Sequence, residues 1–185
     1  MKHFSFFLVG CALAFNAAAV EYKAVQIDKS KVTFQYKQMG VGMEGRFKKI
    51  AAQLSFDPAK PAAAQASIDI DLASIDTGSA EADDEVVGKT WFNVKSFPKA
   101  TFVARQIKPG GPHQFQVSGV LTIKGKSQDI QFPLQYTAQG AVGVFSGGFV
   151  MRRADFAIGE GIWSKFDVVA NDIQVQFQLT AVAGK

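Results

Sequence analysis

The chain has 185 residues, with 20 lysines and arginines against 16 aspartates and glutamates and a formal net charge of +4 at pH 7. This charge is too small and too scattered to indicate a nucleic-acid-binding surface. Cys11 is the only cysteine, so an intramolecular disulfide is excluded and the packed core has to stabilise the fold.

The first 19 residues match the pattern of a secretory signal peptide. Lys2 and His3 provide a positive start, residues 4–15 form an apolar run, and small alanines follow, as a signal peptidase requires. The apolar run is shorter than the about 20 residues that a membrane-spanning helix needs. We therefore expect export to the periplasm, with cleavage after about Ala19.

A competing motif lies inside this leader. Residues 8–11, Leu-Val-Gly-Cys, resemble the lipobox at which bacterial lipoproteins are cut and acylated on cysteine. Cutting there would leave only about six apolar residues in the hydrophobic region, fewer than the roughly 7 to 15 of a signal peptide. The signal-peptide interpretation is preferred, and residues 20–185 are expected to form a single domain.

Most of residues 20–185 alternates apolar and polar side chains with a period of two, which places one set on each face of a β-strand. The polar partners are mainly Gln, Ser, Thr and Asp, so one face is predicted to be dry and the other solvated, as antiparallel sheets allow. The alternating segments are residues 32–37, 50–56, 68–72, 115–123, 130–136, 145–151 and 173–179.

Residues that favour chain reversal separate these segments, at 57–58, 109–112, 124–125 and 139–140. Many short antiparallel strands predict a barrel or a sandwich, and a barrel also removes exposed edges. We expect a mainly β fold, a lipocalin-like antiparallel β-barrel of about eight strands. Such a barrel is either filled by its own side chains or holds one small ligand, and periodicity leaves both open.

Residues 79–94 depart from the strand pattern and predict a helical segment. Acidic residues crowd its first turn, where they favour the positive end of the helix dipole. Val87, Trp91 and Val94 fall on one helical face, whereas Gly88 weakens the helix by about 1 kcal/mol relative to alanine.

Residues 40–45, Gly-Val-Gly-Met-Glu-Gly, match the G-x-G-x-x-G fingerprint of dinucleotide sites, and a strand precedes them. A phosphate site also needs a helix that starts after the glycines, whereas residues 46–56 continue as alternating strand. A glycine-rich turn or bulge in a curved sheet is therefore the preferred interpretation.

No constellation for catalysis, for a metal or for a cofactor emerges from the titratable residues. His113 is the only histidine after the leader and follows a Pro-Gly-Gly-Pro turn, which favours a solvated loop position. The acidic residues at 69–76 and 81–85 lack the spacing of a calcium-binding loop and are interpreted as solvated strand and helix faces. We expect a protein that is not an enzyme.

Phe, Trp and Tyr make up 12% of the chain and either fill a core or line a hole. Gly143, Gly147 and Gly148 remove side chains beside Phe149, which leaves room for a guest or serves bends in the strand. Arg153 continues the parity of this apolar row, so we expect either a basic rim above an apolar lumen or an exposed arginine.

In order along the chain, several segments resemble the YceI-like family of polyisoprenoid-binding periplasmic proteins, also called bacterial lipocalins, and the resemblance covers essentially all of residues 20–185. It rests on the sequences at residues 30–34, 45–47, 56–58, 74–78, 91–94, 97–102, 117–125 and 153–158.

The resemblance implies a lipocalin-like barrel whose lumen holds a long isoprenoid or similar amphiphile, and binding or carriage rather than turnover. Two positions depart from the family. Gln38 stands where the family often has a histidine after the first long strand. Residues 84–87, Asp-Glu-Val-Val, stand where the family often has Asp-x-His-Leu, so no metal or head-group role of those histidines carries over.

The leading hypothesis is a periplasmic protein that sequesters or transports a polyisoprenoid, quinone-like or fatty amphiphile. The alternatives are a solid-core envelope or stress protein that acts through surface contacts, and a lipid hydrolase or isomerase. Transient contact with a membrane surface and formation of a homodimer stay open. The predicted ligand-binding residues are Phe34, Tyr36, Phe47, Trp91, Phe92, Phe102, Phe149, Met151, Trp163 and Phe166 as apolar lining, with Arg153 as a head-group contact.

Overall fold

The computed structural model describes residues 20–184. The predicted signal peptide and the lipobox lie outside these described residues.

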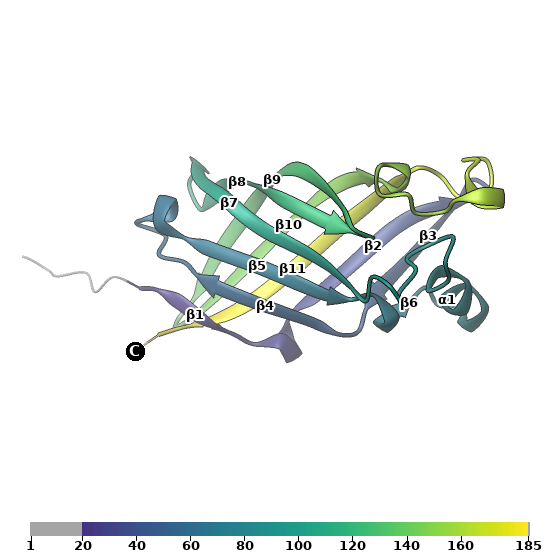
Figure 1. Cartoon of the computed structure of the whole chain (residues 1–185). Helices are drawn as coiled ribbons and strands as arrows, with labels where there is room; N and C mark the ends of the chain where they lie inside the picture. Colours follow the sequence, from purple (N-terminus) through teal and green to yellow (C-terminus); the bar gives the residue numbers. More distant parts are fainter. Residues whose placement is uncertain (1–19, 185) are drawn as a thin grey trace, which may run out of the picture.

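One antiparallel sheet of eleven strands forms nearly the whole domain and curls round a lumen (Figure 1). The order of hydrogen-bonded neighbours is β4-β5-β7-β8-β9-β10-β11-β2-β3-β6, and β1 pairs with β11. This confirms the mainly β, lipocalin-like fold class, with more strands than the eight predicted. The strands are β1 (Tyr22–Val25), β2 (Lys31–Gln38), β3 (Val41–Phe47), β4 (Ile50–Ser55), β5 (Gln65–Asp71), β6 (Ile75–Asp76), β7 (Lys99–Gly111), β8 (Gln114–Ile123), β9 (Lys126–Gln139), β10 (Val142–Arg152) and β11 (Asp172–Ala183).

The alternation of side chains gives the sheet a buried inner face and a polar outer face. In β9, Phe132, Leu134 and Tyr136 are buried, whereas Pro133 and Gln135 between them are exposed. β8, β10 and β11 alternate in the same way, so the predicted apolar rows all face the lumen.

The additional strands come from the region where the sheet closes on itself. The short β1 bridges β11 and the end of β4, since Tyr22 and Phe56 exchange two backbone hydrogen bonds of 2.8 and 3.0 Å. At the other end of the lumen, the two-residue β6 pairs with β3, where Phe47 lies opposite Ile75. The predicted strand over residues 46–56 is therefore split into β3 and β4, whose neighbours differ.

Turns connect most strands where the sequence predicts them. Between β8 and β9, Lys124 and Gly125 have φ angles of 50° and 71°, the left-handed values of the two-residue turn that suits a twisted hairpin. In the 109–112 region, β7 continues to Gly111, so the reversal itself falls on Pro112 and His113.

The helical segment is shorter than predicted. Helix α1 covers Ala80–Val86, and the Oγ of Ser79 accepts a hydrogen bond from the backbone N–H of Ala82 at its start. The rest of the predicted helix, residues 87–94, forms a series of turns. After Val86 the backbone N–H of Gly88 donates to the carbonyl of Glu85, three residues back, and Asn93 has a left-handed φ of 50°. The chain therefore does not continue as an α-helix through residues 87–94.

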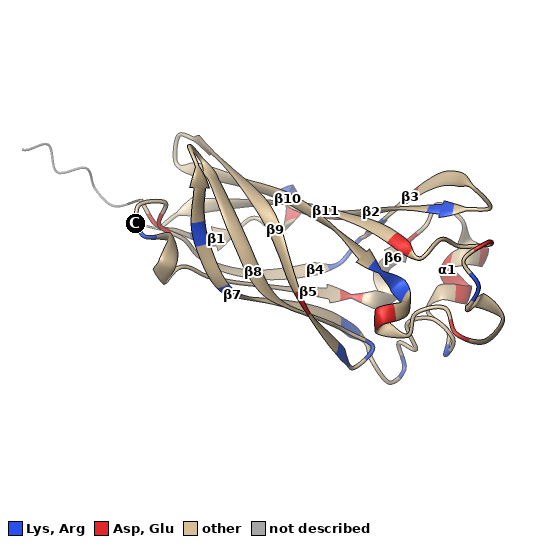
Figure 2. Cartoon of the chain, turned by 90° about the horizontal axis from the view of Figure 1, so that it is seen from above, with Lys and Arg blue, Asp and Glu red and all other residues tan. Residues whose placement is uncertain are grey.

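Short 3₁₀ helices complete the connections: η1 (Ile27–Lys29), η2 (Pro61–Ala63), η3 (Leu72–Ser74), η4 (Arg153–Phe156) and η5 (Gly161–Trp163). Helix α1, the tip of the β2–β3 hairpin and the connection from β10 to β11 lie together at one end of the barrel (Figure 1). We call this end the α1 end. The C-terminus lies at the other end, and Figure 2 shows acidic residues gathered on α1. Within residues 20–184, no helix is long and apolar enough to cross a membrane.

Candidate functional site

A cavity of about 660 Å³ occupies the half of the lumen nearest α1. Its wall comes from inward-facing positions of β2, β10 and β11, such as Phe34, Phe149 and Val175, and its cover from α1 and the turns that follow. Its volume falls in the range of small-molecule pockets, roughly 300 to 1,000 Å³. The inner face of the sheet therefore leaves room that the protein does not fill.

The cavity opens to solvent at the α1 end. Most of its lining residues are buried or half-buried, and its exposed ones belong to the β2–β3 hairpin or to α1 and the residue before it. Those exposed lining residues are Gln38, Met43, Ser79, Glu81, Asp84 and Glu85.

Aromatic rings close the inner end of the cavity. Phe149 stacks on Phe132 with ring centroids 5.6 Å apart, and Phe132 also contacts Phe102 and Phe177 at 5.4 Å each. Of these four side chains only Phe149 lines the cavity. The Phe132 layer therefore forms the floor.

Beyond this floor, the protein's own rings fill the other half of the barrel. Phe56, fully buried, contacts Phe115, Tyr136 and Phe145 with centroid distances of 5.0 to 5.8 Å. Tyr22 and Tyr136 share a hydrogen bond of 2.7 Å between their hydroxyl groups. The sequence left open whether the barrel is filled by its own side chains or leaves room for a ligand. One half of the lumen is filled, and the other half contains the cavity.

The third glycine of the G-x-G-x-x-G sequence makes room for a cavity wall. A Cβ atom on Gly45 would overlap the ring of Phe34 and lie 2.8 Å from the carbonyl oxygen of Asp76. The first glycine, Gly40, has a left-handed φ of 81° in the hairpin turn, and Gly42 lies in β3. The motif belongs to a hairpin and not to a phosphate loop, as the preferred interpretation stated.

Arg153 borders the cavity but is not the exposed rim residue that the sequence predicts. Its side chain is 1% exposed and donates to six backbone carbonyls between residues 158 and 170, at 2.7 to 3.2 Å. The guanidinium group has five N–H donors, so none is left for a head group. Strand β10 ends at Arg152, which is why the parity argument placed Arg153 wrongly.

The guanidinium of Arg153 lies between two aromatic rings, 5.4 Å from the centroid of Trp91 and 5.1 Å from that of Phe166. Burial lowers the pKa of Arg153, because desolvation disfavours the charged form. The carbonyl dipoles and the two rings offset this cost. Arg153 thus organises the connection over residues 157–169, which we call the 157–169 loop.

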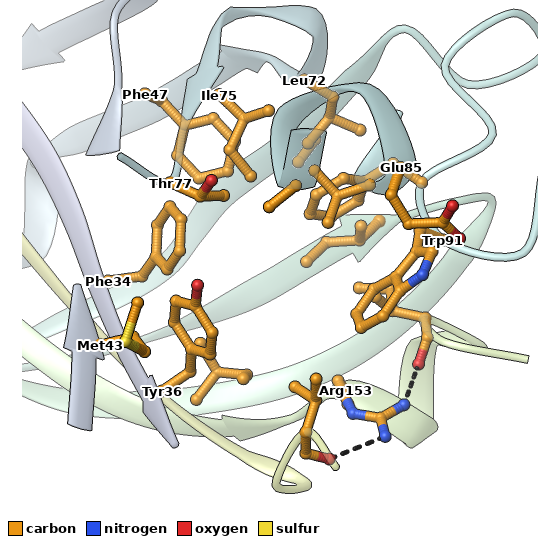
Figure 3. A pocket seen from close by; sticks show the side chains of 18 of the residues that line it. Phe34, Tyr36, Met43, Phe47, Leu72, Ile75, Thr77, Glu85, Trp91 and Arg153 are labelled. Carbon is orange, nitrogen blue, oxygen red and sulfur yellow. Dashed lines mark hydrogen bonds between the residues drawn. The ribbon is translucent and has the colours of Figure 1, made fainter. Parts of the chain in front are cut away.

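Two tryptophans form one side of the cavity, as Figure 3 shows for Trp91. The rings of Trp91 and Trp163 lie 5.5 Å apart, and Nε1 of Trp163 donates to Glu85 Oε1 at 2.8 Å. The carbonyl of Thr90 accepts from the backbone N–H groups of Gly159 and Glu160. These contacts tie α1 and its following turns to the 157–169 loop.

Polar groups gather where the cavity meets solvent. The hydroxyl of Thr77 is buried and donates to Asp83 Oδ1 at 2.7 Å. Burial raises the pKa of Tyr36, and the negative charge of Asp83 adds to the effect. The negatively charged lining residues are Glu81, Asp84 and Glu85 of α1, and Arg153 is the only cation among the described lining residues.

The structure brings nine of the eleven predicted site residues around the cavity. Phe102 and Phe166 are the exceptions. Phe102 belongs to the floor layer, and Phe166 is 48% exposed on the outside of Arg153. Contact of the nine with a guest stays a prediction. They are Phe34, Tyr36, Phe47, Trp91, Phe92, Phe149, Met151, Arg153 and Trp163.

Sequence reasoning missed several lining residues, among them Met43, Leu72, Ile75, Thr77 and Val169. Met43 follows the period of β3, opposite Tyr36, and this register is the signal that could have found it. Leu72 continues the alternating row of residues 68–72, which is the corresponding signal for this position. Ile75, Thr77 and Val169 lie in short connecting segments without a readable period, so only the tertiary structure places them.

The remaining titratable candidates lie away from the cavity or on exposed faces. His113 is exposed in the β7–β8 turn with φ of 57°. Asp69 lies on β5 opposite Thr101 of β7, 3.8 Å from Lys99. Within the described part of the chain, no three His, Cys, Asp or Glu side chains are grouped so that they could hold a metal ion.

A curled antiparallel sheet with a half-open apolar lumen defines a lipocalin-like barrel. The model of the YceI-like domain family matches residues 22–181, and the chain belongs to this family. The chain is 32% identical over 134 residues to a UPF0312 protein of Yersinia pestis (strain Pestoides F), covering 70% of this chain and 69% of that protein.

Two solved structures are similar to it. The structure of BcnA from Burkholderia cenocepacia has 43% sequence identity and a TM-score of 0.83, covering 85% of this chain and 99% of that one. A polyisoprenoid binding domain from Saccharophagus degradans, implicated in plant cell wall breakdown, has 18% identity and a TM-score of 0.68, covering 90% and 99%. The second likeness shows the fold alone.

Proposed function

We propose that this protein holds the tail of a polyisoprenoid or a similar long amphiphile in the cavity at the α1 end, and thereby sequesters or carries it. The observation that supports this most is the apolar cavity itself, closed by the Phe132 layer at one end and open at the other. A guest of this class fits because its tail gains from leaving water while its head stays at the mouth.

The side chains of the cavity favour binding of the guest rather than its chemical turnover. The walls deep in the cavity are aromatic and aliphatic, and the carboxylates lie at the mouth. Glu85 already accepts a hydrogen bond from Trp163, and Asp83 from Thr77. The name of the polyisoprenoid binding domain from Saccharophagus degradans agrees with a guest of this class.

The closed half limits how the guest lies. The Phe132 layer blocks passage to the aromatic half, so a tail enters from the α1 end and cannot thread the whole barrel. A tail longer than the cavity folds back or extends out of the mouth. The filled half keeps the barrel rigid, since close-packed rings contribute stability without a guest.

We propose export to the periplasm as the setting of this function, because residues 1–19 have a signal-peptide pattern. Protein recovered from a periplasmic extract should begin at about Val20 by N-terminal sequencing. An acylated N-terminus at Cys11 would overturn this part of the proposal.

Native mass spectrometry of protein purified from its own envelope, followed by organic extraction, tests the binding. We expect a bound lipid that is lost in Phe149→Arg, which places a charge in the lumen, and in Ala100→Phe, which fills the cavity without one. Val150→Arg is the control, since Val150 is 62% exposed on the outer face of the same strand. Equal loading of all variants, or no lipid in the wild type, would contradict the proposal.

A further inference from the structure

Exposed apolar side chains gather beside the mouth of the cavity. Of the ten large apolar side chains that are exposed within residues 20–184, six lie on the β2–β3 hairpin and the 157–169 loop. The other four, at positions 20, 27, 103 and 150, are scattered. We call the six the apolar rim: Met39, Val41, Met43, Ile162, Phe166 and Val168.

Backbone hydrogen bonds join the two segments of the rim into one unit. The N–H of Met39 donates to the carbonyl of Val168 at 2.7 Å, and the N–H of Ala170 donates to the carbonyl of Lys37 at 2.9 Å. Gln38 and Val169 form an isolated β-bridge between the same segments. The apolar rim is therefore held by paired main chain.

The rim is continuous with the cavity. Met43 belongs to both, since it is 36% exposed and also lines the cavity. Ile162 is 86% exposed, yet the next residue, Trp163, lines the cavity, and the ring of Phe166 covers Arg153 in the cavity wall. A hydrocarbon tail leaving the mouth on this side meets apolar side chains before it meets water.

We propose that the apolar rim docks on the surface of a lipid bilayer, where it inserts its side chains and lets the guest pass between the membrane and the cavity. This rests on the function proposed above. A guest of that class resides in a lipid phase, so its exchange with a buried cavity favours a mouth that is itself in contact with lipid.

The size and form of the rim favour a bilayer over a protein partner. A stable protein interface takes about 20 to 30 residues on each side, whereas the rim has six apolar side chains on two narrow segments. Separate apolar side chains at the ends of loops suit a fluid surface, which needs no complementary shape and binds in proportion to the apolar area inserted.

Charge near the rim gives no attraction to anionic lipid. At the tips of the two rim segments, exposed Lys37 and Lys165 are matched by exposed Glu44 and Asp167, and the neighbouring helix α1 adds carboxylates at the mouth. Attraction to anionic lipid is therefore not the driving force, and apolar insertion is. We expect binding to zwitterionic vesicles that persists at high salt concentration, because only electrostatic binding is screened.

Flotation of the full chain with phosphatidylcholine vesicles tests docking. We expect the double variant Val41→Ser/Ile162→Ser, whose two side chains belong to the apolar rim but not to the cavity lining, to bind these vesicles at least tenfold more weakly than the wild type. The matched control is Val103→Ser/Val150→Ser, two exposed valines outside the rim, which should bind like the wild type. A single substitution, Met39→Ser, provides a milder rim variant should the double variant unfold.

Lipid exchange separates this proposal from the proposed function. Rim variants should still load a prenyl alcohol supplied from dilute ethanol, but should take it from vesicles at least tenfold more slowly. Phe149→Arg should float with vesicles and load nothing. If the rim variants bind vesicles and exchange lipid as well as the wild type does, docking is overturned while the cavity function stands. A wild-type protein that self-associates through the rim and does not float would overturn docking in the same way.

Discussion

The hydroxyl groups of Tyr22 and Tyr136 lie 2.7 Å apart in the filled half of the barrel, although 114 residues separate them in the chain. This bond links β1 to β9 across the lumen, at the place where the first strand closes the sheet. The aromatic rings around this bond fill one half of the barrel, and the cavity lies in the other half, beyond the Phe132 layer.

The buried Tyr136 should make the free energy of unfolding decrease as the pH rises in the alkaline range. Burial, together with the hydrogen bond that it shares with the hydroxyl of Tyr22, raises the pKa of Tyr136 above the ordinary value of 10.0. Below pH 10 the folded and unfolded states are both protonated and the contribution is complete. Above it the unfolded state loses the proton first, so the free energy of unfolding falls by up to about 1.4 kcal/mol per pH unit for this group.

Urea unfolding of the wild type and Tyr136→Phe between about pH 9 and about pH 11.5 measures this contribution. The wild type should lose stability more steeply than the variant over this range. Equal slopes would show that Tyr136 titrates alike in the folded and unfolded states.

Gly45 and Gly42 lie in the same strand and should respond in opposite ways to alanine. In Gly45→Ala, the new methyl group overlaps the ring of Phe34, so we expect a loss of about 2 kcal/mol and a smaller cavity. A methyl group on Gly42 meets nothing within 4 Å, so Gly42→Ala should be neutral or slightly stabilising. Thermal unfolding distinguishes the two, and similar values would rule out the contact with Phe34 as the cause.

Arg153 should be far more important for folding than its neighbour. Arg153→Met leaves six carbonyls without their donor and should cost about 3 kcal/mol or more. Arg153→Lys restores the charge but only three donors, and should recover a minor part.

Arg152 provides the control, because it is exposed and pairs only with Asp155. Arg152→Met should cost less than about 1 kcal/mol. Denaturant unfolding followed by tryptophan fluorescence reports on the 157–169 loop in all three variants, and equal losses at positions 152 and 153 would contradict the role given to Arg153.

The charges of the lining predict which head group is preferred. Glu81, Asp84 and Glu85 lie at the mouth, and the donors of Arg153 are all engaged. A prenyl alcohol should therefore bind at least about tenfold more tightly than the prenyl phosphate of the same length, since like charges brought together cost about 1.4 kcal/mol or more. Calorimetry with both ligands measures the ratio. Glu81→Gln/Asp84→Asn should reduce it, and tighter binding of the phosphate would refute this preference.

The strands and most turns could be predicted from the sequence because the period of two and the turn residues are local signals. The division of the lumen could not. Parity says that Ala100 and Phe115 both point inward, but only the register of the sheet places Ala100 beside the cavity and Phe115 in the ring cluster that fills the other half. The burial of Arg153 depends on carbonyls up to 17 residues away, which no local pattern reveals.

The length of the helix and part of the cavity wall escaped prediction for a similar reason. The apolar residues at 87–94 have helical spacing, yet Trp91 is fixed by its contacts with Trp163 and Arg153 and not by a helical turn. Phe102 has the same inward parity as the lining residues, and the layer around Phe132 takes it into the floor. Tertiary contacts decided both positions.

The two tryptophans of the chain, Trp91 and Trp163, both line the cavity, so tryptophan quenching by a brominated fatty chain measures its occupancy directly. We predict saturable quenching with one site per chain in the wild type and in Val150→Arg, and its loss in Phe149→Arg with the fold retained by circular dichroism. Quenching that is equal in all three proteins, or that never saturates, would contradict a guest held in the open half of the barrel.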